Sequence, residues 1–131
     1  MRFVDTSFWA ALQLRDDVHA VAARALWESN RGALLTSNHV IGETWTFLRR
    51  RLGHGAAVAF VDRANASRDL AIVFVDELIE RDSWRWLHRH DEREYSFVDA
   101  TSFAVMRRRR IREALAFDGD FAAAGFVELR P

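Results

Sequence analysis

Short apolar runs alternate with amphipathic segments along this chain. Runs typical of strands occupy residues 2–5, 33–36, 71–75, 114–117 and 126–129. Segments with helical spacing occupy residues 6–13, 18–28, 38–52, 55–66, 77–88 and 97–109. Strands that are separated by helices favour right-handed crossovers and a parallel sheet covered on both faces. The pattern therefore predicts an α/β fold around a central, mainly parallel sheet of four to five strands.

Two of these segments carry specific expectations about burial. Residues 71–75, with the sequence AIVFV, form the clearest candidate for a buried strand. The helix expected over residues 18–28 has apolar or small residues at i, i+3 and i+4 spacing, which predicts its buried stripe. That stripe consists of Val18, Val21, Ala22, Ala25 and Leu26.

Composition indicates a folded chain of ordinary size. Its 131 residues suit one domain, residues 1–131, and half of them are hydrophobic, which makes disorder unfavourable. Because there is no cysteine, neither a disulfide nor a thiolate metal site can form. Asp5 interrupts the position where a signal peptide needs an apolar segment, and no apolar run reaches the ~18 residues of a membrane span. We therefore expect a soluble, cytoplasmic protein with no membrane partner.

Four carboxylates are the candidate functional groups. Asp5 ends the first apolar run, Asp118 ends the fourth, and Asp99 lies in the first turn of the last long helix. Glu43 lies inside a helix, from which it can point toward the same region. In a parallel sheet, ligands bind beyond the carboxyl ends of the strands, at the point where the strand order reverses. We expect the four carboxylates to converge there after folding.

Such a set of oxygen ligands is typical of a site for a hard cation. With no cysteine and no paired histidines at ligand spacing, Mg²⁺ or Mn²⁺ is the natural occupant. Carboxylates packed within ~4 to 6 Å raise one another's pKa unless a cation neutralises them. A divalent ion can hold a phosphate oxygen and lower the pKa of a water, so phosphodiester hydrolysis is the reaction that fits best.

Four segments resemble, in order and spacing, the motifs of PIN-domain ribonucleases, and they most resemble VapC-type toxins of type II toxin-antitoxin systems. The segments are residues 3–7 (FVDTS), the helix around Glu43, residues 96–106 (SFVDATSFAVM) and residues 116–121 (AFDGDF). The resemblance implies a three-layer α/β/α PIN fold and a Mg²⁺-dependent endoribonuclease, with Mn²⁺ as an alternative ion. It also implies an RNA substrate (tRNA, rRNA or mRNA), a homodimer, and inhibition by a small cognate antitoxin.

By the same resemblance, Asp5, Glu43, Asp99 and Asp118 form the catalytic, metal-binding quartet. Asp118 is preferred to Asp120 because it directly follows the apolar run, and Asp120 is interpreted as a helix cap or an outer supporting group. Thr6 and Ser7 are further supporting residues, because a hydroxyl there could bond a carboxylate or a metal-bound water. Either residue could equally cap the helix that follows.

Each carboxylate also has a purely structural interpretation. Ser96-x-x-Asp99 has the spacing of a capping box, and Asp118-Gly119 is a common turn pair. Glu43 resists such an interpretation, because its apolar flanks predict a largely buried helix in which an unpaired charge is costly. The joint pattern of four acids favours catalysis over separate structural roles.

Other functions are tested by the same residues. Phosphotransferases with a nucleophilic aspartate and receiver domains normally place a lysine beside the phosphate, and all 19 basic residues here are arginine. A non-catalytic module that binds RNA or protein is disfavoured because all four acids are present. A PIN-type nuclease of rRNA maturation or RNA decay, without an antitoxin, stays open. Arg49–Arg51 and Arg107–Arg110 are candidate phosphate contacts, but the RNA-binding residues stay unassigned.

Overall fold

A computed structural model describes all 131 residues of the chain. Its elements in chain order are β1 (Arg2–Val4), α1 (Thr6–Gln13), α2 (Ala20–Ser29), β2 (Leu34–Ser37), α3 (Asn38–Leu52), α4 (His54–Ala66), β3 (Leu70–Val73), α5 (Glu77–Arg89), α6 (Phe97–Arg109), β4 (Glu113–Leu115), α7 (Asp120–Ala123) and β5 (Val127–Glu128). Most bounds lie within two residues of those predicted from the apolar pattern.

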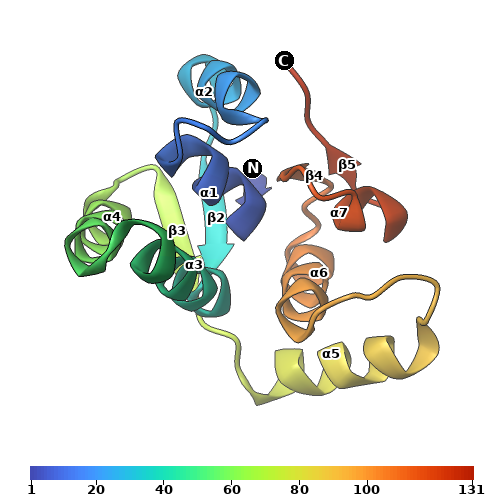
Figure 1. Cartoon of the computed structure of the whole chain (residues 1–131). Coiled ribbons are helices and arrows are strands. Elements are labelled where there is room, and N and C mark those ends of the chain that lie inside the picture. Colours follow the sequence, from blue (N-terminus) through green and yellow to red (C-terminus); the bar gives the residue numbers. More distant parts are fainter.

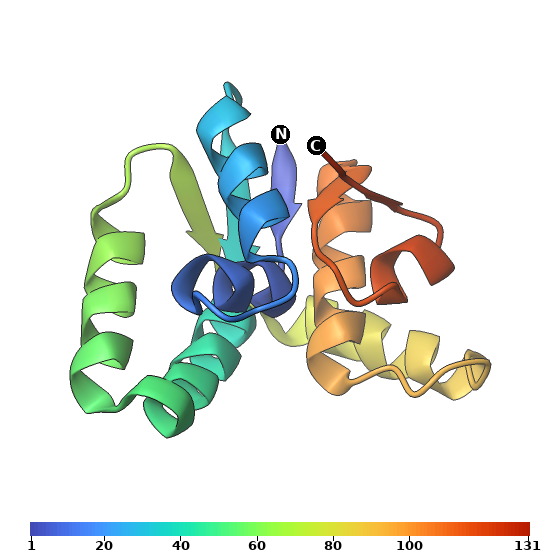
Figure 2. The same ribbon diagram turned by 45° about the horizontal axis from the view of Figure 1, so that its top comes forward.

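The five strands form one parallel sheet in the order β3-β2-β1-β4-β5. The chain moves outward from β1 to β3 with α1 to α4 on one face, then crosses back to β4 with α5, α6 and α7 on the other (Figures 1 and 2). Helices on both faces bury the sheet, as parallel sheets require. The predicted three-layer α/β/α architecture with a parallel sheet is confirmed.

The strand order reverses between β1 and β4, the two central neighbours in this topology. Their register pairs Arg2 with Glu113 and Val4 with Leu115. The pairing extends one residue beyond β1, because the backbone N–H of Asp5 donates to the carbonyl oxygen of Leu115 at 3.1 Å. The carboxyl ends of β1 and β4 therefore lie side by side, which is the arrangement that opens a crevice for ligands in α/β sheets.

The core lies on both faces of β1, β2 and β4, and it is rich in aromatic rings. On β1, Phe3 and Val4 are fully buried. The ring of Phe103 on α6 lies 5.0 Å from that of Phe121 on α7, edge to face, and the ring of Phe3 lies 6.0 Å from that of Phe121. These contacts hold α6 and α7 against the sheet, which fixes the helices that flank the crevice.

The prediction of a strand over residues 71–75 is confirmed within two residues at each end, but the prediction that it is buried is wrong. The strand β3 covers Leu70–Val73 and lies at an edge of the sheet, with Ala71 exposed. Phe74, which follows it, is 76% exposed. An apolar run shows only that a segment suits a strand, whereas its place in the sheet depends on the neighbouring strands.

The stripe predicted for residues 18–28 is also wrong in part. The helix α2 begins at Ala20, and it buries Ala20, Ala23 and Leu26. Val18 is 90% exposed and Val21 is 78% exposed. The helix packs against α1, and its small residues Ala20 and Ala23 rather than Val21 are buried.

The short helix α7 has no periodic pattern in the sequence, because four residues are too few for one, and the interpretation of Asp120 as a helix cap is the one indication of it. It starts after Gly119, whose φ of +83° would be strained for any residue other than glycine. The last predicted strand, residues 126–129, is present as the two-residue edge strand β5. None of the helices combines the length and the apolar character that a membrane crossing requires.

The contrast between Val105 and Val18 provides a test of this packing. Val105 on α6 is 1% exposed and Val18 is 90% exposed, so Val105→Ala should lower the free energy of unfolding by about 2 kcal/mol. Val18→Ala should change it by less than about 0.5 kcal/mol. Urea unfolding of both variants beside the wild type measures the difference, and equal effects at the two sites would contradict the burial of α6 described here.

Candidate active site

A cavity of about 420 Å³ opens at the carboxyl ends of β1 and β4. All four carboxylates predicted from the sequence line it: Asp5, Glu43, Asp99 and Asp118. Thr6 and Ser7, predicted as supporting residues, line it too. The folded chain therefore brings together groups that are up to 113 positions apart in sequence.

Asp5 is both the end of β1 and the N-cap of α1. Its Oδ2 accepts hydrogen bonds from the backbone N–H of Ser7 at 3.1 Å and from the Ser7 hydroxyl at 2.7 Å. The same hydroxyl oxygen accepts a hydrogen bond from the backbone N–H of Phe117 at 3.0 Å. Ser7 thus ties the Asp5 carboxylate to the segment that follows β4, whereas the helix cap is Asp5 itself and neither Thr6 nor Ser7.

Burial strongly perturbs the Asp5 carboxyl group. The residue is 2% exposed, and this burial, together with the charges of Asp118 and then Asp99, raises the pKa of Asp5 to about 8. The hydrogen bonds from Ser7 act in the opposite direction, because they favour the ionised form. At neutral pH the carboxyl group therefore holds a proton unless a cation replaces it.

Asp99 starts α6 and has a structural role as well. Its Oδ2 accepts from the backbone N–H of Ser96 at 2.9 Å, and the Ser96 hydroxyl accepts from the backbone N–H of Asp99 at 2.9 Å. This reciprocal pair is the capping box expected from the spacing. Burial, with smaller contributions from the charges of Asp120 and Asp118, still raises the pKa of Asp99 to about 6. Asp99 therefore both helps to cap α6 and places a carboxylate beside the other acids.

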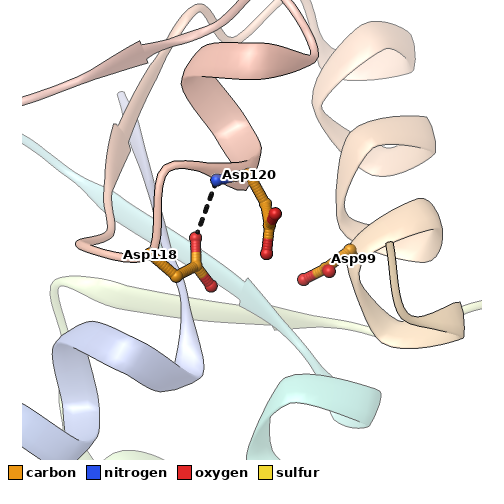
Figure 3. A group of neighbouring side chains, drawn as sticks. All are labelled: Asp99, Asp118 and Asp120. Atoms are coloured by element: carbon orange, nitrogen blue, oxygen red, sulfur yellow. Dashed lines mark hydrogen bonds between the residues drawn. The ribbon is translucent and has the colours of Figure 1, made fainter. Parts of the chain in front are cut away.

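Asp99, at the start of α6, points toward Asp118 and Asp120, which come from the loop and the first turn of α7 (Figure 3). One carboxylate oxygen from each lies within 4.8 Å of the others. Asp118 Oδ1 accepts from the backbone N–H of Asp120 at 3.1 Å. Partial burial, followed by the charge of Asp120, raises the pKa of Asp118. These three carboxylates therefore form a group that could hold a metal ion beside the cavity.

Asp118 and Asp120 differ in their counter-charges. Asp120 Oδ1 accepts a hydrogen bond from Arg93 Nε at 2.9 Å, which makes an ion pair. Arg93 contacts Asp118 only through its backbone carbonyl oxygen, at 3.3 Å from Nη2. Asp120 is the first residue of α7 and not its cap, which is Gly119. The interpretation of Asp120 as a cap is therefore wrong, and the carboxylate of Asp118 is the one of the pair without a cationic partner.

The loop that carries Asp118 is held by Glu128 on β5. The Glu128 side chain is 3% exposed. Its carboxylate accepts hydrogen bonds from the backbone N–H of Gly119 at 3.2 Å and from that of Ala122 at 3.0 Å. A Cβ atom at Gly119 would lie 3.3 Å from Arg93 Nη2 and would press on that guanidinium, while the φ of +83° favours glycine. The position of the acidic loop is thereby fixed by the last strand of the sheet.

Glu43 lines the cavity from α3, but its surroundings differ from those predicted. The residue is exposed, and α3 buries only Val40, Thr44 and Leu48. The expectation that Glu43 lies on a largely buried helix is therefore wrong, because its apolar neighbours are spread around α3 and do not enclose it. Its presence at the rim of the cavity is the observation that connects it with the buried acids.

Sequence reasoning missed several residues of this region. Asp17, His19 and Phe47 line the cavity, and Arg93 comes from the loop between α5 and α6. No local pattern marks these positions, because they enter the site through tertiary contacts. For Arg93, the available signal was a single arginine among acidic residues, which is common on protein surfaces.

Comparisons with known proteins agree with this geometry. The sequence model of the PIN domain matches residues 2–127. The 23S rRNA-specific endonuclease VapC20 of Mycobacterium tuberculosis, from strains CDC 1551 / Oshkosh and H37Rv, is 59% identical over 134 aligned positions, which cover 100% of this chain and 99% of the relative. The crystal structure of M. tuberculosis VapC20, described as a sarcin-ricin loop cleaving toxin, matches with a TM-score of 0.96 and 56% identity over 100% of both chains. With motifs, fold and acidic cavity in agreement, the chain belongs to the PIN-domain family.

Proposed function

We propose that this protein is a divalent-metal-dependent endoribonuclease and the toxin of a type II toxin-antitoxin system. The observation that carries the proposal is the cavity in which Asp5, Asp99 and Asp118 lie together, each with a raised pKa. Structural proteins rarely keep several uncompensated carboxylates beside one another, whereas metal-dependent nucleases require them. The relatives named above act as endonucleases on rRNA, which supports the same reaction class here.

The residues present fit a hard divalent cation. Asp5 is almost fully buried and its carboxyl group has no cationic side chain among its hydrogen-bond partners. The remaining donors are also carboxylate oxygens, which Mg²⁺ and Mn²⁺ prefer. Asp5, Asp99 and Asp118 would hold the ion, with Glu43 at the rim. When bound, such an ion supplies charge neutralisation and Lewis acidity toward a phosphate oxygen and a water.

The remaining groups keep the acidic residues in place. The Ser7 hydroxyl orients the Asp5 carboxylate and ties it to the segment before Asp118. The Arg93 guanidinium neutralises Asp120, which limits the repulsion that Asp118 experiences. The capping box holds Asp99 at the start of α6. Because these positions are set before substrate binds, little reorganisation is needed when charge develops on the phosphate.

For the substrate, we propose the sarcin-ricin loop of 23S rRNA. The support is the name and title of the relatives, together with identity that extends over the whole chain at 59%. Incubation of the purified protein with total RNA, with ribosomes and with an oligoribonucleotide of the loop, with Mg²⁺, with Mn²⁺ or with chelator, tests the proposal. Cleavage of a different RNA would retain the nuclease and reject this substrate.

As partners we propose a small antitoxin and a second copy of the chain. A second cavity, of about 450 Å³, is lined by Trp9, Trp27 and Phe60 together with Arg24 and Arg63. Trp9 Nε1 is buried there without a hydrogen-bond partner. This mixture of aromatic rings and cationic side chains suits an antitoxin segment with apolar and acidic residues. Exposed Phe74 and Leu78 support a homodimer.

Replacing one aspartate at a time by asparagine should distinguish the metal ligands from the supporting carboxylate by their effects on kcat. Asp99→Asn and Asp118→Asn should reduce kcat by more than about 100-fold, and Asp120→Asn by about 10- to 100-fold, because Asp120 already pairs with Arg93. Cleavage of the loop oligoribonucleotide in Mg²⁺ measures all three variants, with thermal unfolding as the control for folding. A larger loss for Asp120→Asn than for Asp118→Asn would contradict the assignment.

The raised pKa of Asp5 predicts a pH dependence of stability in chelator. The pKa of Asp5 is raised from 3.8 to about 8 in the folded chain, so the folded chain binds the Asp5 proton more tightly than the unfolded chain does. The stability that this proton contributes is complete below pH 3.8 and is lost as pH rises through about 8. Between pH 6 and 8 the free energy of unfolding should fall by up to about 1.4 kcal/mol per pH unit. Mg²⁺ should reverse the fall, because it binds the ionised carboxylates.

The control for that experiment is Asp5→Asn, which keeps the shape and the cap but cannot ionise. Its stability should be less dependent on pH over the same range, and less responsive to Mg²⁺. Subtracting its profile from that of the wild type removes contributions from the histidines. Parallel profiles of the two proteins would show that Asp5 is ionised in the folded chain without metal.

If a short open reading frame lies beside this gene, co-expression with its product tests antitoxin binding. Trp27→Ala should weaken the complex by about 30-fold or more, as expected for a tryptophan in an interface cavity. Trp84→Ala, at a residue that is 49% exposed outside that cavity, is the matched control. Light scattering measures the complex and, for the isolated chain, distinguishes a monomer of 15.1 kDa from a dimer. Isolation of the chain alone after co-expression would contradict the partner proposal.

A further inference from the structure

The imidazole ring of His19 lies in the active cavity without a role in the acidic site. Its centroid is 4.5 Å from that of the Phe117 ring, and the two planes differ by only 4°. Phe117 in turn stacks on Phe8, at 5.7 Å and 18°. Phe8 and Phe117 are buried, whereas His19 is half-buried and lines the cavity. His19 has no other aromatic neighbour, so this stack of rings ends on it at the cavity.

The backbone around His19 is held in place by local hydrogen bonds. Asp17 Oδ1 accepts from the backbone N–H of His19 at 2.8 Å. The carbonyl oxygen of Asp17 accepts from the backbone N–H of Ala20 at 3.0 Å, and that of His19 accepts from Ala23 at 2.8 Å. The backbone that carries the ring is therefore fixed before anything binds, which limits the conformational freedom that binding would cost.

Helix capping does not explain a histidine at this position. His19 is the N-cap of α2, where Ser, Thr, Asp and Asn are preferred, yet its side chain makes no capping hydrogen bond. Its ring nitrogens make no hydrogen bond to any other group of the chain. The contact with Phe117 is the interaction that positions the side chain, and that contact directs the ring into the stack.

The stack is connected covalently and by hydrogen bonding to the proposed metal ligands. Phe117 immediately precedes Asp118 in the chain, and its backbone N–H donates to the Ser7 hydroxyl that holds Asp5. A group stacked on His19 would therefore be held at a fixed position relative to the acids. The cavity, at about 420 Å³, falls within the size range of small-ligand pockets.

We propose that His19, supported by Phe117, is the stacking platform for a nucleobase that flanks the scissile phosphodiester. The proposal rests on the proposed function as a ribonuclease. Sequence-selective RNA recognition uses unstacked bases placed against aromatic side chains, and an imidazole offers such a face. His19 is thus a positioning residue for the substrate. By holding one base, it determines which phosphate of an RNA loop reaches the carboxylates.

Three substitutions separate stacking from the chemistry of the ring nitrogens. His19→Phe keeps a planar ring and removes the nitrogens, His19→Gln keeps a hydrogen-bond donor and removes the ring, and His19→Ala removes both. A matched control is His90→Ala, because His90 also stacks on an aromatic ring, Trp86, at 4.1 Å and 18°, but lies outside the cavity. Steady-state cleavage of a sarcin-ricin loop oligoribonucleotide gives KM and kcat for each variant.

Stacking predicts that His19→Ala and His19→Gln raise KM by about 5- to 100-fold, while His19→Phe and His90→Ala stay close to the wild type. A second measurement uses the Asp99→Asn protein, in which cleavage is expected to be strongly slowed, and the same RNA with 2-aminopurine beside the cleaved bond. Its fluorescence should be quenched on binding, and His19→Ala in the same background should abolish the quenching. This readout does not depend on turnover, and thermal unfolding verifies that each variant is folded.

The outcomes that overturn the proposal are distinct from failure of the proposed function. If the wild type cleaves the RNA and His19→Ala has the same KM and the same quenching, His19 is not a platform. If His19→Phe is as impaired as His19→Ala while His19→Gln is active, the ring nitrogens act on the substrate and the stacking proposal is wrong. If the wild type cleaves no RNA under any metal condition, the proposed function fails and the platform proposal fails with it.

Discussion

The burial of the Asp5 carboxylate at the end of the central strand is the constraint on which the site depends. Folding brings β1 and β4 together, and this places Asp5 out of water and near two other acids. Isolated burial of a charge is strongly unfavourable, so the group keeps a proton or acquires a cation. Two hydrogen bonds from Ser7 offset only part of that desolvation. The fold therefore makes binding of a cation favourable at the Asp5 carboxylate.

Around the cavity, carboxylates that cap helices also supply the negative charge of the site. Asp5 caps α1 and Asp99 belongs to the capping box of α6. A helix N-terminus favours a carboxylate there, which stabilises acids that would otherwise repel one another. Arg93 neutralises Asp120, whereas Asp118 is left with a raised pKa and no cationic partner. Structural and chemical roles are therefore not alternatives in this protein, because each cap also aims a carboxylate at the cavity.

Aromatic packing connects this charged region with the core. Phe117 contacts both the buried ring of Phe8 and the cavity-lining ring of His19, and it is the residue before Asp118. The loop that follows is fixed by Glu128 on the last strand. A distortion of β4 or β5 would therefore shift the acids and the apolar wall of the cavity together. Such coupling is expected where a site is built at the switch point of a parallel sheet.

The sequence by itself determined the fold class, the order of elements and the four candidate acids, because apolar periodicity and the position of Asp5 and Asp118 after apolar runs are local properties. Only the tertiary structure decided that β3 is an edge strand, that Glu43 is exposed, and that His19 and Arg93 reach the acidic region. Edge position depends on which strands pair, and side-chain surroundings depend on helices distant in sequence. Neither is encoded in a local pattern, because both arise from contacts that exist only after the sheet has formed.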